Sequence, residues 1–147
     1  MIKYAQIINE KNKQCDVGLG TDTKFFKSIG MKEIEVEQGY DNNWYLKGYA
    51  PQKPLEELKE EKISELKEKR DEYKKTIFIK DKNLLELEDK SKYHFDNLIL
   101  GLCGYTETDL KEYKTYISNI SKIYDDYKLK INNATTKQEL DKIIINF

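Results

Sequence analysis

The chain has 147 residues, a length that corresponds to one domain or two small ones. Its 26 basic and 27 acidic residues leave a formal net charge of -1, which excludes nucleic-acid binding driven by excess positive charge and a polybasic membrane anchor. Hydrophobic residues make up 38% of the chain, enough for a core although 36% of the residues are charged.

The chain starts with a polar stretch that lacks the long apolar run of a signal peptide. No later run approaches the about 20 apolar residues that cross a bilayer. We therefore expect a soluble protein made in the cytoplasm. Two short β-prone runs, 3–8 and 14–19, predict a hairpin. Thr21 or Asp22 can then cap a short helix that ends at Gly30.

Two further strands complete the predicted N-terminal module. Residues 33–37 alternate between charged and apolar side chains, as in a half-buried strand. The turn-forming residues 41–43 follow, and the aromatic run 44–49 predicts the returning strand. Residues 1–50 are therefore expected to form a small β-β-α-β-β domain.

A joint with both prolines of the chain, at 51–54, separates this module from a mainly helical domain at 55–147. Pro54 suits the first position of a helix, where its missing N–H is not needed. The helix predicted over 55–75 carries a thin apolar stripe, which indicates that only one side is covered.

A second hairpin is predicted from the runs 76–79 and 84–88, which the turn residues 81–83 separate. Asp89 is then positioned to cap a helix that fades at the glycines of 101–104.

The most regular helix is expected to begin at Thr106 with Asp109, or at Thr108, and to end at the two asparagines 132–133. Its apolar residues are spaced alternately by three and four, which is the pattern of a coiled-coil seam. The seam residues are Leu110, Tyr113, Ile117, Ile120, Tyr124, Tyr127 and Ile131. A capping box of Thr135 with Gln138, or of Thr136 with Glu139, predicts a final helix that runs to 143–147.

No arrangement of residues predicts an enzyme, a cofactor site or a metal site. The single histidine, His94, has no recognisable catalytic partner, and the segment 18–20 lacks the remaining glycines of a phosphate-binding loop. Cys15 and Cys103 match no metal-binding spacing and are expected to be reduced thiols. We therefore expect neither catalysis nor a small-molecule ligand.

Two groups of residues are candidates for protein contact, and each has a structural alternative. The seam helix can pack inside its own domain, or pair with copies of itself or with another protein. The aromatic residues Tyr40, Trp44, Tyr45 and Tyr49 can form the core of the small domain or an exposed interface patch. Strand alternation places Trp44 and Leu46 on one face and Tyr45 and Lys47 on the other, so one pair should be exposed.

The sequence resembles small proteins encoded in the tail-gene region of phages and prophages of Gram-positive bacteria. The resemblance spans essentially the whole chain, with the segment Trp-Tyr-Leu-Lys-Gly-Tyr-Ala-Pro at 44–51 as its clearest motif. The matching stretches are 17–23, 25–31 and 43–51 in the first module, and 69–71, 89–92 and 134–140 in the helical domain of unknown function.

This resemblance implies a non-enzymatic structural or accessory component of the fibre or baseplate region of a phage tail, in the virion or in the host cytoplasm during assembly. Its implied partners are other tail proteins, or copies of itself. The alternative is a tail-fibre assembly chaperone, which shares the plan of a small module, a proline-containing joint and a helical C-terminus. A regulatory protein that binds a host partner is a third, less favoured class.

Overall fold

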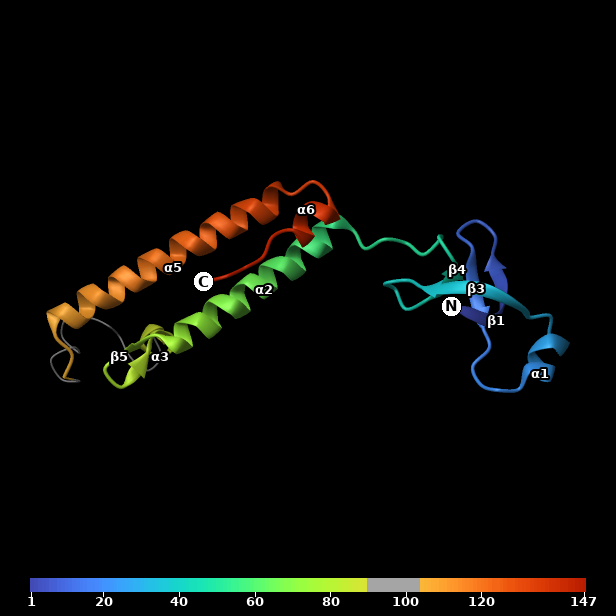
Figure 1. Ribbon diagram of the computed structural model, residues 1–147, viewed down its shortest axis with the longest axis horizontal. Helices are drawn as coiled ribbons and strands as arrows, with labels where there is room; N and C mark the ends of the chain where they lie inside the picture. Colours follow the sequence, from blue (N-terminus) through green and yellow to red (C-terminus); the bar gives the residue numbers. More distant parts are fainter. Residues whose placement is uncertain (90–103) are drawn as a thin grey trace. The chain divides into compact units, whose positions relative to one another are not determined.

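The computed structural model describes residues 1–89 and 104–147, and the chain forms two compact units, Met1–Pro54 and Leu55–Phe147 (Figure 1). Strands build the first unit, whereas helices dominate the second. The protein is therefore a mixed α+β protein, as expected from the sequence, and each unit is described by itself below.

The first unit is a closed antiparallel barrel with the strand order β1-β2-β4-β3. The sequence predicts the strands, but not that they close into a barrel. Alternate residues point inward, so Ala5, Cys15 and Val36 meet in a core to which Trp44 and Leu46 add their side chains. The strands are β1 (Ile2–Asn9), β2 (Gln14–Val17), β3 (Lys32–Gln38) and β4 (Trp44–Leu46).

Helix α1 (Thr23–Ser28) packs on the outside of the barrel. The Asp22 side chain caps it by accepting from the Phe25 N–H at 3.0 Å, and Gly30 follows with a φ of +90°, so the predicted cap and stop are both confirmed. The Phe26 ring is so close to Gly18 that an added Cβ would lie 2.8 Å from it. Gly18 is therefore required for close packing of α1.

Strand β4 ends at Leu46, so the strand predicted over 44–49 is too long. After Leu46 the chain turns, and Gly48 adopts a φ of +88°. The Glu37 carboxylate accepts from the backbone N–H groups of Gly48 at 2.8 Å and of Ala50 at 3.0 Å. These N–H groups are satisfied by a side chain, so no strand partner is needed.

In the second unit, two long helices lie side by side and antiparallel (Figure 1). They are α2 (Leu55–Thr76) and α5 (Glu107–Asn133). Near the start of α2, Lys59 Nζ donates to the carbonyl of Asn132 at the end of α5, at 3.0 Å. Helix α2 begins at Leu55, so Pro54 directly precedes the first helical residue and does not occupy the first helical position that the sequence predicts for it.

The first turn of α5 confirms one of the two predicted starts. Thr106 and Asp109 form a reciprocal capping box, in which Thr106 Oγ1 accepts from the Asp109 N–H and Asp109 accepts from the Thr106 N–H. The helix ends at Asn133, as the paired asparagines predict.

The predicted hairpin at 76–88 is only half correct. Strands β5 (Phe78–Ile79) and β6 (Lys82–Asn83) pair, but Leu84–Glu88 is helix α3. The Asn83 side chain and Glu86 form a capping box that starts α3. Lys74 of α2, only 6% exposed, pairs with Glu88 of α3 at 2.5 Å. The helix predicted to follow Asp89 falls on residues 90–103, which lie outside the described part of the chain, as do His94 and Cys103.

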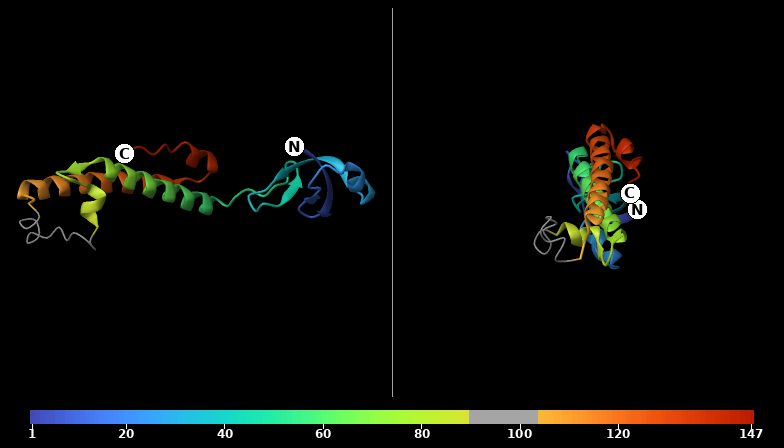
Figure 2. Two further views of the ribbon diagram at one scale, coloured as in Figure 1. Left: turned by 90° about the horizontal axis from the view of Figure 1, so that it is seen from below. Right: turned by 90° about the vertical axis from the view of Figure 1, so that its left-hand side faces the viewer.

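The chain end differs from its prediction. Helix α6 (Lys137–Asp141) is capped by Thr136, which accepts from the Glu139 N–H, but residues 143–147 are not helical. We call these five residues the tail; they run back along α2 and α5, on one side of the helix pair (Figures 1 and 2). Ile144 is 71% exposed and Ile145 only 1%, an alternation that marks an extended segment. The β-branched isoleucines favour this conformation over a helix.

Two apolar clusters form the core of the second unit. One lies at the α3 end of the long helices and the other at the α6 end, where the tail enters it. The first contains Ile79, Leu84, Leu87, Tyr105, Leu110 and Ile120, and the second contains Leu66, Ile131, Ala134, Leu140 and Ile145.

Candidate protein-contact surfaces

The seam of α5 meets partners within its own unit. Leu110 and Ile120 belong to the cluster at the α3 end, and Ile131 to the cluster at the α6 end. The four remaining seam residues, Tyr113, Ile117, Tyr124 and Tyr127, are half-buried against one cluster or the other. The apolar face of this helix is therefore covered by α2, α3 and the tail, in line with the structural alternative.

The tyrosines of the seam combine burial with polar contacts. Burial raises the pKa of the Tyr113 hydroxyl, and the Arg70 guanidinium lies 5.0 Å from the centre of the Tyr124 ring. The Tyr127 hydroxyl donates to the carbonyl of Asn146 and accepts from its N–H, at 3.2 and 3.1 Å. Tyr127 thereby connects the seam to the backbone of the tail.

The four aromatic residues around β4 are separated by the fold. Tyr45, only 4% exposed, lies against Gly39 and donates its hydroxyl to Asp41 at 2.6 Å. This hydrogen bond holds the pKa of the Asp41 carboxyl below its usual value. Tyr45 therefore supports the turn between β3 and β4. Alternation correctly places Tyr45 on the face opposite Trp44 and Leu46, but the expected exposure of one whole pair is wrong, because the turn covers Tyr45 while Lys47 is exposed.

 Trp44 faces the barrel core, half-buried, with Lys3 Nζ 4.9 Å from the centre of its ring. Tyr40 and Tyr49 are 49% and 54% exposed, one in the turn before β4 and the other after its end. Of the four predicted aromatic contact residues, these two tyrosines are therefore the most exposed.

A second exposed apolar group was not predicted from the sequence. Ile2 and Leu19, 70% and 82% exposed, line a cleft of about 310 Å³ on the barrel together with Tyr4 and Phe26. The ring of Phe25, 54% exposed, contacts that of Phe26 with the ring centres 6.0 Å apart. We call Ile2, Leu19 and Phe25 the cleft patch. A sequence shows that these residues are apolar, but not that the fold leaves them outside.

Polar groups border the cleft patch. The Tyr4 hydroxyl donates to Glu33 at 2.5 Å, which raises the pKa of Tyr4, and Lys27 Nζ lies 5.8 Å from the centre of the Tyr4 ring. An apolar centre with a polar border is the usual composition of a protein interface.

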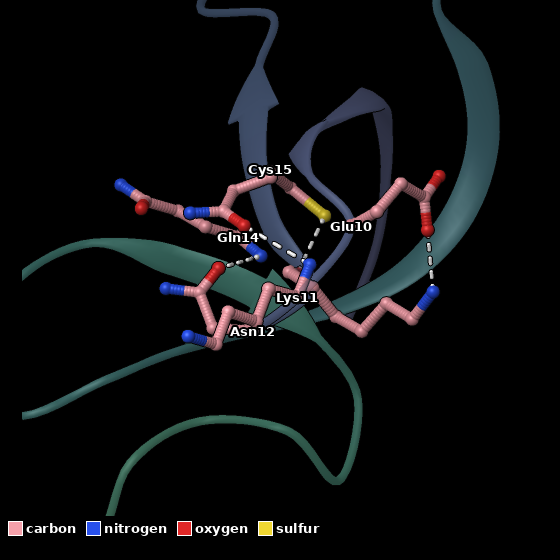
Figure 3. A network of polar contacts seen from close by, with 7 residues as sticks. Glu10, Lys11, Asn12, Gln14 and Cys15 are labelled. Atoms are coloured by element: carbon pink, nitrogen blue, oxygen red, sulfur yellow. Dashed lines mark hydrogen bonds and ion pairs between the residues drawn. The ribbon is translucent and has the colours of Figure 1, made fainter.

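The turn between β1 and β2 has a polar network whose role is structural (Figure 3). Asn12 accepts from the Gln14 N–H at 3.1 Å, and Lys13 pairs with Glu10 at 2.5 Å. The Cys15 thiol donates to the carbonyl of Lys13, and burial raises its pKa. A buried thiol with a raised pKa is a poor nucleophile, so Cys15 acts as a core residue.

Within residues 1–89 and 104–147, no three His, Cys, Asp or Glu side chains are grouped so that they could hold a metal ion. In the same part of the chain, no helix has both the length and the apolar composition for crossing a bilayer. The role of His94 stays a prediction, because that residue is outside the described part.

No protein-family model matches the chain, and no curated protein or solved structure is significantly similar to it. The relation to phage tail-region proteins therefore stays a prediction from the motifs quoted above.

Proposed function

We propose that the chain is a non-enzymatic structural or accessory component of a phage tail or phage-tail-like particle, in the fibre or baseplate region. It acts through contacts with other proteins of the tail. The motif resemblance supports the assignment to a tail, and the surface of the barrel supports the mode of action.

The distribution of exposed apolar residues carries this proposal. In the described part of the chain, the large apolar residues that remain exposed are concentrated in the barrel unit. They are Met1, Ile2, Ile8, Leu19, Phe25, Ile29, Tyr40 and Tyr49 in the barrel unit, against Phe78, Leu129 and Ile144 in the helical unit. A protein partner would therefore bury more exposed large apolar side chains on the barrel unit than on the helical unit.

Covering the cleft patch is energetically favourable. Burial of apolar surface contributes about 25 cal/mol per Å², or about 1.5–3 kcal/mol for one large side chain. Leu19 is held outward between two glycines, and Gly20 has a φ of +127° that other residues rarely adopt. The backbone thus presents an apolar side chain that the barrel itself does not use.

Quantitative mass spectrometry of purified particles tests the proposal. Particles from the bacterium that encodes the chain should contain it in a fixed ratio to the major tail proteins, after washing with high salt. If the chain is abundant in the lysate but absent from mature particles, the structural assignment is wrong, and that distribution would identify a fibre-assembly chaperone.

A further inference from the structure

The tail lies in an extended conformation against Lys69 and Tyr73 of α2 and Tyr127 of α5. We call the surface that these three residues form under the tail the groove. Two hydrogen bonds join the Tyr127 hydroxyl to the backbone of Asn146, and Lys69 Nζ donates to the carbonyl of Ile145 at 3.1 Å. All three hydrogen bonds are made to main-chain atoms of the tail. Side chains of both long helices therefore bind the extended backbone. Tyr127 belongs to α5 and Lys69 to α2.

Two side chains of the tail supply its specificity. Ile145 is 1% exposed within the cluster at the α6 end. Phe147 stacks on Tyr73 of α2 and contacts Tyr127 of α5, with ring centres 5.9 and 6.2 Å apart. Ile144, directly before Ile145, is 71% exposed. The groove therefore selects an aliphatic residue followed, two positions later, by an aromatic one.

The tail is covered on one side only. A cleft of about 320 Å³ runs beside it, lined by Lys69, Tyr73, Ile145 and Phe147 among others. The tail is joined to α6 through Lys142, and the Ile143 N–H donates to the carbonyl of Leu140 at 3.0 Å. The hinge for a release of the tail would therefore lie at Lys142 and Ile143, directly after α6.

We propose that this groove also binds the tail of a second copy of the chain, so that two copies exchange their tails. The second copy is the occupant because its residues 143–147 carry the same aliphatic and aromatic anchors, and every contact of the closed form can be remade between chains. Such an exchange changes only the backbone conformation of the hinge. It also makes the equilibrium between monomer and dimer depend on the protein concentration. This inference concerns self-association and does not depend on the assignment to a phage tail.

The exchange is tested with the full-length chain and a fluorescent peptide of residues 141–147. The receptor is the full-length chain with Ile145→Asp, a substitution that should release its own tail from the groove. The matched control is the full-length chain with Ile144→Asp, at the exposed neighbouring position. We expect the Ile145→Asp chain to bind the peptide at least tenfold more tightly than the Ile144→Asp chain. A peptide that itself carries Ile145→Asp should not bind.

If Ile145→Asp unfolds the helical unit, adding the native peptide should restore the helical circular dichroism signal. Equal binding by both receptors, or neither binding nor regained helix, would overturn the groove as a peptide site. Light scattering at rising concentration tests the second copy as the source. Wild type and Ile144→Asp should form dimers that Ile145→Asp lacks, and a wild type that stays monomeric overturns the exchange.

Discussion

At the scale of single residues, close approach and capping fix the local structure. Gly18 is the clearest case, because the Phe26 ring fills the space that any side chain would need. The sequence indicates a turn around 18–20, and the positive φ of Gly20 agrees with this. The tight contact with Phe26 is a tertiary feature that the local sequence does not encode.

Gly18→Ala should destabilise the barrel unit by about 1–3 kcal/mol, because the added methyl group overpacks the contact with Phe26. Urea unfolding followed by the fluorescence of Trp44, which lies in the barrel, measures the change. Ser28→Ala, at an exposed position of α1, is the control and should have a small effect. An unchanged unfolding midpoint for Gly18→Ala would show that α1 adjusts freely.

Asp109 is the residue whose titration should affect the start of α5. The Thr106 N–H donates to its carboxylate at 2.8 Å and holds its pKa below the usual value. A lowered pKa in the folded state means that this contribution is present above the unfolded pKa and lost as pH falls below about 4.

We therefore expect Asp109→Asn, whose side chain cannot titrate, to reduce the loss of stability of the helical unit between neutral pH and about pH 3. Urea unfolding followed by circular dichroism at both pH values measures the difference. Identical pH dependence in wild type and variant would remove this carboxylate from the acid sensitivity of the unit.

At the scale of elements, most strands and helices follow from local patterns. The charged and apolar alternation in β3, the capping box at Thr106 and the paired asparagines after α5 each predict an element that the structure contains. The errors occur where the same segment carries a strand pattern and a helix signal. Residues 85–88 alternate between leucine and glutamate as a half-buried strand would, but both residue types favour helices, and the capping box of Asn83 with Glu86 starts one.

The candidate site is less predictable than the elements. Periodicity identifies the seam of α5, but not that α2, α3 and the tail cover it within the same chain. Likewise, the composition around β4 marks Tyr45 as an interface residue, whereas the turn at 39–43 buries it. Exposure depends on tertiary packing, so Leu19 and Phe25 could not be selected from the sequence.

Ile120→Asp tests the seam of α5. Ile120 is 2% exposed in the cluster at the α3 end, so an unpaired carboxylate there should cost about 3 kcal/mol or more. Thermal unfolding of the helical unit, followed by circular dichroism, should shift to lower temperature. Ser121→Asp, at an exposed position of the same helix, is the matched control, and equal shifts for both variants would contradict a buried seam.

At the scale of the whole molecule, two compact units share one chain, each with its own core. Trp44→Ala should remove a half-buried side chain that packs on the barrel core, and destabilise the barrel by less than the about 3–5 kcal/mol that truncating a fully buried Trp costs. The helical unit should keep its circular dichroism signal and its unfolding midpoint. A lower unfolding midpoint of the helical unit in Trp44→Ala would show that the two units unfold as one.

We propose that the cleft patch of the barrel joins the chain to a tail particle. The most direct measurement compares, by mass spectrometry, how much chain enters purified particles when the bacterium produces wild type, the double variant Leu19→Asp with Phe25→Asp, or Gln52→Asp. Gln52 is an exposed residue outside the barrel strands and controls for added negative charge. We expect wild type and Gln52→Asp to enter particles equally, whereas the amount of the folded double variant in particles should fall at least tenfold. Equal incorporation of all three chains would contradict it.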